Sequence, residues 1–111
     1  MSTEGTMLDT AVKFDSAKPK YSTVPTHAMN EVMQAFTYGA AKYEAYNYSK
    51  GMEYTRYIDA AIRHINAFLK GEDIDESGNT HLSHAVASLM MLMDNMAIGT
   101  GTDNRNPIYK A

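Results

Sequence analysis

The strongest constraint on the fold of this chain is a pair of long stretches with helical apolar spacing, separated by a short acidic turn. In residues 53–70 and 80–98 the apolar side chains recur at helical intervals, which predicts two amphipathic helices. Gly71 and Gly99 follow these stretches, and glycine is typical of helix ends. Because the turn, residues 71–78, is short, we expect the two helices to run antiparallel.

A third helix is predicted upstream of this hairpin. It is expected to begin near Thr26, where apolar residues start to recur on one face, and to continue into residues 40–51 before it ends. Gly39 is expected to interrupt this helix or to pack closely. Residues 13–25 contain two prolines, which favour an extended segment lying across the domain.

The predicted fold class is therefore all-α, a small bundle of three main helices with an extended N-terminal arm. With 111 residues, of which 44% are hydrophobic, the chain is long enough for one small core and too short for a second domain. We expect residues 1–12 to form a flexible arm and residues 13–99 to form the helical domain. Residues 100–111 are expected to be an irregular tail, or a tail docked on a neighbour.

Composition excludes several classes of function. Without a run of about 18 apolar residues or the basic and apolar blocks of a secretory signal, the chain is expected to be soluble and cytoplasmic, with no membrane partner. The lack of cysteine excludes disulfides, thiolate zinc sites and a cysteine nucleophile. A net charge of -3 argues against a long nucleic acid as partner, although a few local cations suffice for a small anion.

The methionine-rich residues 89–96 indicate self-association. This part of the last helix is apolar on more sides than one core can cover. A subunit interface would cover the remainder, so a homo-oligomer is expected. The methionines themselves are assigned to packing, because their flexible side chains fill irregular gaps.

Three of the four histidines are predicted to meet where the two helices of the hairpin join. His64 lies near the end of the first helix, whereas His81 and His84 share one face at the start of the second. A helix start attracts anions and keeps a nearby imidazole neutral, which favours a phosphate contact near neutral pH. The same side chains also suit a transition-metal site or a purely structural role.

The acidic turn adds carboxylates to this corner. Those of residues 72–76 could hold Mg2+ for phosphate chemistry, or they could form a solvated loop. Asp75 is the best single candidate. Together with His81 and His84 it makes the predicted metal set, for Mg2+ or another divalent ion.

Aromatic and cationic residues mark a candidate nucleotide site. Tyr43 and two further tyrosines flank Asn47, just after Lys42. A tyrosine ring can stack on a nucleobase, an amide can read the edge of the base, and a lysine can hold a phosphate. Arg63 and Lys18 offer further cations. Tyrosines at helix ends are also common packing residues, so composition alone leaves both interpretations open.

Several short motifs, in order along the chain, resemble a phage-associated family, the N-terminal domain of dATP/dGTP diphosphohydrolases. They read Lys13-Phe14-Asp15-Ser16-x-Lys18-Pro19, Tyr38-Gly39-Ala40-x-Lys42-Tyr43 with Asn47, Arg63-His64, Gly71-Glu72-Asp73-Ile74-Asp75, Ser77-Gly78 and His81-Leu82-x-His84-Ala85. Each motif is weak, but the ordered series is specific. The chain departs from the family pattern at Pro25-Thr26, where Pro-Pro is usual, at Tyr48, where Trp is usual, and in a shortened acidic turn.

The resemblance implies a purine deoxynucleotide ligand and hydrolysis of its phosphates, in the host cytoplasm if the chain is phage-encoded. Under this hypothesis residues 13–99 form a nucleotide-binding domain. A divalent ion clamps the phosphates and a water attacks phosphorus. The expected catalytic residues are His64, His81 and Asp75, and the expected nucleotide-binding residues are Lys18, Lys42, Tyr43, Asn47, Arg63 and His84.

Two other hypotheses remain open. The chain could sequester a nucleotide-derived defence signal without cleaving it, as an anti-defence protein, and intact ligand would then be recovered from it. It could also be a helical assembly module with no small ligand. In that case His64, His81 and His84 would tolerate replacement without loss of any binding.

Overall fold

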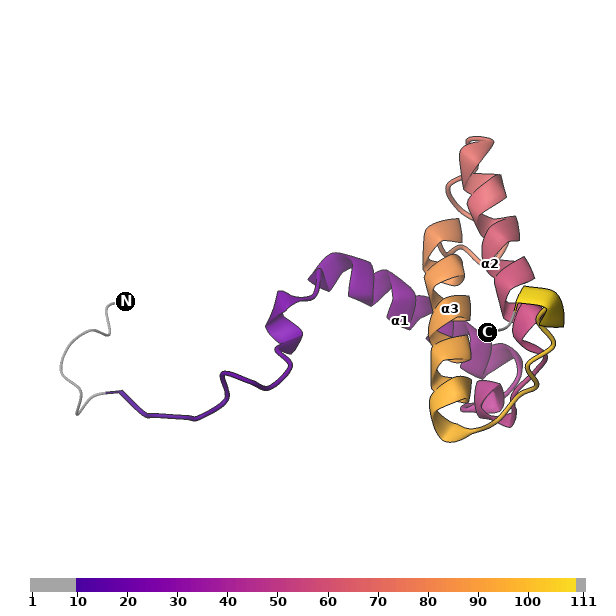
Figure 1. Ribbon diagram of the computed structural model, residues 1–111. Coiled ribbons are helices and arrows are strands. Elements are labelled where there is room, and N and C mark those ends of the chain that lie inside the picture. Colours follow the sequence, from indigo (N-terminus) through magenta and orange to yellow (C-terminus); the bar gives the residue numbers. More distant parts are fainter. Residues whose placement is uncertain (1–9, 110–111) are drawn as a thin grey trace.

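The computed structural model describes residues 10–109, and within this range the chain is all-α (Figure 1). The helices are α1 (Thr26–Lys42), α2 (Tyr54–Leu69) and α3 (His81–Ile98), with short 3-10 turns η2 (Tyr21–Thr23), η3 (Asn47–Lys50) and η4 (Pro107–Tyr109). The predicted fold class, a small bundle of three main helices, is confirmed. The flexible arm predicted for residues 1–12 lies mostly outside the described residues.

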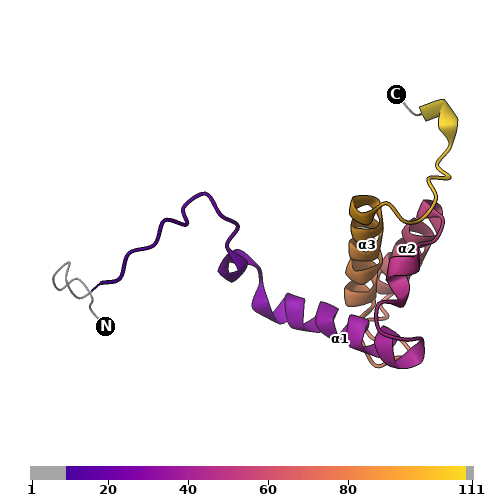
Figure 2. The ribbon, with the colours of Figure 1, turned by 90° about the horizontal axis from the view of Figure 1, so that it is seen from below.

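Helices α2 and α3 form the predicted hairpin, and α1 crosses the pair. Figure 1 shows α2 and α3 side by side, and Figure 2 shows α1 running across them. Val32 and Ala35 of α1 pack with Ala87 of α3 in one buried cluster, and Phe36 lies partly buried against it. The first turn and a half of α1 is exposed and extends away from the hairpin.

The extended segment before α1 does not lie across the domain, so that prediction is wrong. Residues 10–25 are all exposed, and Figure 1 shows them leading away from the helices. The two prolines keep the segment out of a helix, but no apolar contact folds it back. As a result the radius of gyration is 19.2 Å, whereas a compact chain of about 100 residues has about 13 Å.

Helix α1 ends earlier than the sequence predicts. It stops at Lys42, and the chain reaches η3 through Tyr46, whose backbone is left-handed with φ 64°. Gly39 lies inside the helix, and apart from its chain neighbours and the backbone of α1 itself no atom lies within 4 Å of the position that a Cβ would take. Gly39 therefore neither interrupts α1 nor packs closely.

The C-terminal tail docks on the start of α2 in the same chain. The Tyr54 amide donates to the Thr102 carbonyl at 2.9 Å, and the Asn104 side chain accepts from the Thr55 amide at 3.1 Å. Asn104 thus caps a helix whose own N-cap residue makes no side-chain bond. The close approach requires glycine, because a Cβ on Gly51 would lie 2.3 Å from the Gly101 nitrogen.

Buried polar side chains join three elements at the end of the hairpin remote from the acidic turn. We name Asn95 and its partners Tyr48 and Tyr57 the polar clamp. Asn95 of α3 is 0% exposed, its side-chain amide donates to the Tyr48 carbonyl of η3 at 2.9 Å, and its side-chain oxygen accepts from the Tyr57 hydroxyl of α2. Tyr57 is itself 1% exposed. The other buried hydrophobic side chains are small, namely Val32, Ala35, Ala61, Ala85 and Ala87. Asn95 therefore connects η3 to a core that has little apolar volume.

Among residues 10–109, no helix has the length and apolar character needed to cross a membrane.

We predict that Asn95→Ala lowers the free energy of unfolding by about 2 kcal/mol, because the buried Tyr57 hydroxyl loses its side-chain acceptor and the Tyr48 carbonyl keeps only the Gly51 amide as donor. Chemical denaturation followed by circular dichroism measures the change. Asp94→Ala, at the exposed neighbouring position, should shift the same value by less than about 0.5 kcal/mol. Equal effects of the two variants would contradict a structural role of the clamp.

Candidate functional site

The acidic turn folds tightly onto the start of α3 and places one carboxylate in the corner of the hairpin. The His81 amide donates to the Asp73 carbonyl, and the Asp75 amide to the Asn79 carbonyl, both at 2.9 Å. Gly78 closes the turn with φ 86°, a conformation that favours glycine. These bonds turn the chain back on itself, so Asp75 lies beside the histidines while its acidic neighbours stay exposed.

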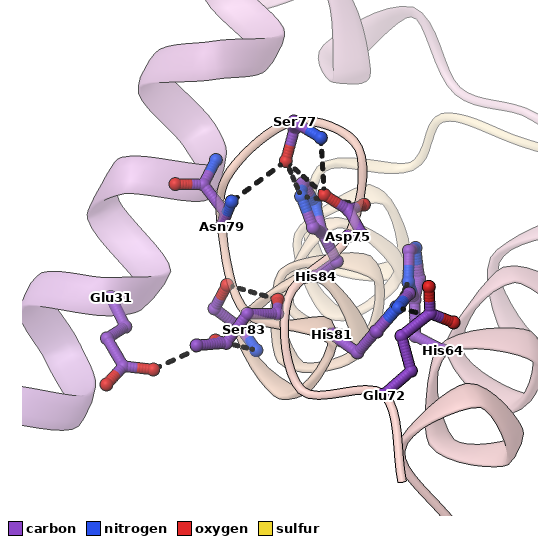
Figure 3. Close-up of polar contacts among 10 residues, drawn as sticks. Glu31, His64, Glu72, Asp75, Ser77, Asn79, His81, Ser83 and His84 are labelled. Atoms are coloured by element: carbon purple, nitrogen blue, oxygen red, sulfur yellow. Dashed lines mark hydrogen bonds and ion pairs between the residues drawn. The ribbon is translucent and has the colours of Figure 1, made fainter. Parts of the chain in front are cut away.

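The three histidines predicted to meet do so. The Nδ1 atoms of His64 and His81 lie 2.9 Å apart, and their ring centroids are 5.2 Å apart. The rings of His64 and His84 stack with centroids 5.0 Å apart. Figure 3 shows the three imidazoles and Asp75 gathered between the turn and the two helices. His64 therefore bridges the two histidines of α3.

Ser77 is a member of this cluster that the sequence analysis did not select. Its hydroxyl donates to Asp75 Oδ1, which also accepts from the Ser77 amide at 2.7 Å. The same hydroxyl lies 2.8 Å from His84 Nε2, so with its proton given to Asp75 it accepts from an Nε2–H (Figure 3). The tautomer of His84 that fits carries its proton on Nε2. The Asp-x-Ser spacing of a side-chain turn was the available sequence signal.

His81 is the most buried histidine of the cluster, at 7% exposed. Its Nε2 is buried without a hydrogen-bond partner among the described residues, and the nearest carboxylate oxygen, on the exposed Glu72, lies 3.4 Å away. An Nε2–H facing a carboxylate is favourable, whereas a bare nitrogen there would face like charge density. The Nδ1 of His81 is therefore the nitrogen without a proton.

Electrostatics keeps one histidine neutral and one carboxylate charged. Burial lowers the pKa of His64, and the neighbouring His84 and His81 lower it further. Burial raises the pKa of Asp75, but the hydrogen bonds from Ser77 and the charge of His84 outweigh this, and the pKa of Asp75 is lowered. Near neutral pH the corner therefore holds an uncharged imidazole beside a carboxylate.

A cleft of about 1070 Å³ opens from the histidine corner toward α1 and η3. Seven of the residues predicted for the site line it, namely Lys42, Tyr43, Asn47, Arg63, His64, Asp75 and His84. Lys18 does not line it, because it lies on the exposed arm, and His81 lies behind His64 rather than at the surface of the cleft. The structure thus gathers most of the predicted residues and leaves out two.

Three cations line the cleft without an ion pair to a carboxylate among residues 10–109, namely Lys42, Arg56 and Arg63. The pKa of Lys42 is raised, first by its hydrogen bond to the Tyr43 hydroxyl, and its Nζ lies 5.3 Å from the centre of that ring. Arg56 was missed by the sequence analysis, because it stands near the start of α2 with no motif around it. The carboxylates of Glu44, Asp75 and Glu76 line the same cleft, so the positive charge offered to an anion is local to these three cations.

The ligand atoms that could hold a metal ion together belong to His64, Asp75 and His81, and all lie within 4.8 Å of one another. The sequence predicts His84 in this set in place of His64, and that prediction differs from the structure. In the structure His84 Nε2 instead contacts Ser77 at 2.8 Å and Asp75 Oδ2 at 3.4 Å. Two imidazoles and one carboxylate suit a divalent transition ion better than Mg2+, which prefers oxygen.

The fold and the site define a class of protein, a small helical domain with a histidine–carboxylate corner beside a cation-lined cleft. A family profile described as "dATP/dGTP diphosphohydrolase, N-terminal" matches residues 9–105. Since the match covers most of the chain, the chain belongs to this family, as the ordered motifs predict. Neither a curated protein nor a solved structure matches the chain.

We predict that the metal-free protein loses stability as the pH falls through the range just below about 6.5, the usual pKa of histidine. The pKa of His64 is lowered in the folded state, so over this range the unfolded chain binds more protons and acidification favours it. The melting temperature, measured in buffer with EDTA between about pH 7.5 and 5 to span this range, should fall toward acid.

His64→Gln should reduce this pH dependence, because it removes the titrating group. His27→Gln is the matched control, since His27 lies on the exposed start of α1 and pairs with Glu31. A pH dependence that is the same in the His64→Gln variant and in the unmodified protein would refute the assignment.

Proposed function

We propose that this chain binds a purine deoxynucleoside triphosphate in the cleft and, with a divalent ion, hydrolyses it to the monophosphate and diphosphate. The observation that carries the proposal is the set of three cleft-lining cations, Lys42, Arg56 and Arg63, with no carboxylate paired to them among residues 10–109. The family description supports the choice of dATP and dGTP.

The cations suit the phosphates of such a ligand. Guanidinium groups of Arg56 and Arg63 can each bind two phosphate oxygens, whereas Lys42 acts as a point charge. The cleft volume of about 1070 Å³ is just above the range that small-molecule sites usually occupy, and it leaves room for a nucleotide with its water. The three unpaired cations therefore suit a small anion such as a nucleotide, rather than a long nucleic acid.

Aromatic residues that also line the cleft suit the base. Tyr43 is 64% exposed and Tyr46 is 74% exposed, and both line the cleft, so their faces are available for stacking. Asn47 lies beside them at the start of η3, where its side-chain amide can donate to and accept from a purine edge. In this proposal the base lies over η3 and the phosphates extend toward α2.

The proposed reaction is attack of water on the α-phosphorus. The water oxygen forms the new bond, the bond from the α-phosphorus to its bridging oxygen breaks, and diphosphate leaves. With Nε2–H held by Ser77, His84 has a bare Nδ1 that can take the proton from water. A divalent ion bound at His64, Asp75 and His81 would supply charge neutralisation to the phosphates.

A panel of nucleotides tests the proposal. We expect dATP and dGTP to bind in isothermal titration calorimetry, and Arg63→Ala to weaken binding by about tenfold or more, since a charge-assisted hydrogen bond is lost. Lys70→Ala is the control, because Lys70 is exposed and lies outside the cleft. With added divalent ion, anion-exchange chromatography should resolve the deoxynucleoside monophosphate and diphosphate.

The outcomes separate binding from cleavage. Intact nucleotide released on heating, without product under any metal, would contradict hydrolysis and favour sequestration. If neither nucleotide binding nor product is found, the proposal is overturned, and the hypothesis of a helical assembly module without a small ligand remains.

We also propose that the chain acts as a homo-oligomer. One stripe on α2 and one on α3 remain between 38% and 68% exposed although they are apolar, and they comprise Ile58, Ile62, Ile65, Leu82, Val86, Leu89 and Met93. We name these the apolar stripes. The buried core of one copy consists mostly of alanine, so a single copy has little apolar burial to offset the entropy of folding. A second copy covering the stripes would supply the missing burial.

We predict that light scattering after size exclusion gives a mass of at least twice the 12.3 kDa of one chain. Val86→Lys places a charge in an apolar stripe and should shift the protein toward the monomer, because burial of an unpaired charge is costly. Val12→Lys, on the exposed arm, should not. A monomeric unmodified protein would refute the interface.

A further inference from the structure

We infer that His64, Asp75 and His81 form a protein-held site for a divalent transition ion such as Zn2+, Mn2+ or Fe2+, with its open positions toward the cleft. The inference deepens the proposed function, because it names the kind of ion and its ligands. It rests on the geometry of the corner, on an unpartnered buried nitrogen, and on the groups that surround the three ligands.

The two imidazoles lie near the separation that a shared ion requires. Nitrogens bound at about 2.1 Å lie about 3.0 Å apart at a right angle, as in an octahedral site, and about 3.4 Å apart at the tetrahedral angle that zinc prefers. The Nδ1 atoms of His64 and His81 are separated by 2.9 Å, and His64, Asp75 and His81 each offer a ligand atom within 4.8 Å of the other two. A single ion between them would replace one shared proton.

The protonation states of the ligands fit metal binding. His81 is 7% exposed, its buried Nε2 has no hydrogen-bond partner among the described residues, and that atom faces Glu72 at 3.4 Å. This arrangement places the proton of His81 on Nε2 and leaves Nδ1 bare. Metal-bound histidines commonly direct their other N–H at a carboxylate, and Glu72 is near enough to take this part.

The carboxylate ligand is oriented by its own neighbours. Asp75 Oδ1 accepts from the Ser77 amide and hydroxyl, whereas Oδ2 has only the 3.4 Å contact to His84. Oδ2 is therefore the oxygen with lone pairs available to an ion. His64 and Asp75 line the cleft and His81 does not, so water or a phosphate oxygen could reach an ion here from the cleft.

Direct metal binding by the full chain, without nucleotide, tests the inference. After treatment with EDTA and dialysis, we expect one Zn2+ per chain by plasma mass spectrometry, and Co2+ should give visible absorption bands from histidine coordination. His64→Gln and His81→Gln should abolish tight binding. Glu72→Gln changes only the group behind His81, and it should weaken binding by about 10- to 100-fold.

Two controls make the test specific. His27→Gln should leave the affinity unchanged, because His27 lies on α1 outside the corner. His84→Gln should retain tight zinc binding, since His84 is not a ligand in this site. Loss of zinc binding in that variant would favour the set of Asp75, His81 and His84 as ligands. Asp75→Asn keeps the shape of the side chain, and helical circular dichroism confirms that each variant is folded.

Unchanged zinc affinity in folded His81→Gln, or no zinc bound above the level of the His64→Gln variant, would overturn the inference. These outcomes are independent of nucleotide. Zinc binding without nucleotide binding would refute the proposed function alone. Nucleotide binding in EDTA, without any zinc site, would refute the metal site alone.

Discussion

The polar clamp around Asn95 is the interaction on which the rest of the structure depends. Alanines dominate the buried core, so few large apolar contacts hold the helices together. Asn95 replaces them with two buried hydrogen bonds, one to η3 and one to Tyr57 of α2. Because η3 carries the wall of the cleft that includes Asn47, the clamp also sets the width of the candidate nucleotide site.

The shortness of the acidic turn gives the corner its chemistry. A turn closed by Gly78 and by backbone bonds to the start of α3 leaves its carboxylates few positions, and only Asp75 is drawn inward. The same shortness forces α2 and α3 to run antiparallel, which brings His64 beside His81 and His84. The length of this turn in the sequence therefore determines both the antiparallel arrangement of α2 and α3 and the grouping of the site residues.

The helical spacing of apolar residues and the glycines at helix ends predicted α2 and α3 well, because both features depend only on residues close together in the sequence. The second and third helices agree with the structure to within a residue at each end, and Thr80 caps α3 by accepting from the Ser83 amide. The end of α1 was missed, since the helix stops at Lys42 with Tyr43 as its C-cap and no glycine or proline follows there to signal it. The predicted course of the arm failed because contacts between distant segments, rather than proline, decide where an extended chain lies.

The meeting of the histidines was predictable from topology, but their pairing was not. Spacing places His81 and His84 on one face of a helix, and only the rotation of that helix decides which ring turns toward His64 and which toward Ser77. The same rotation divides α3 into two faces. His84, Ala87, Ser88 and Met91 line the cleft, whereas Leu82, Val86, Leu89 and Met93 belong to the apolar stripes. Since no residue of the stripes lines the cleft, a second copy can cover them while the cleft stays open to a ligand.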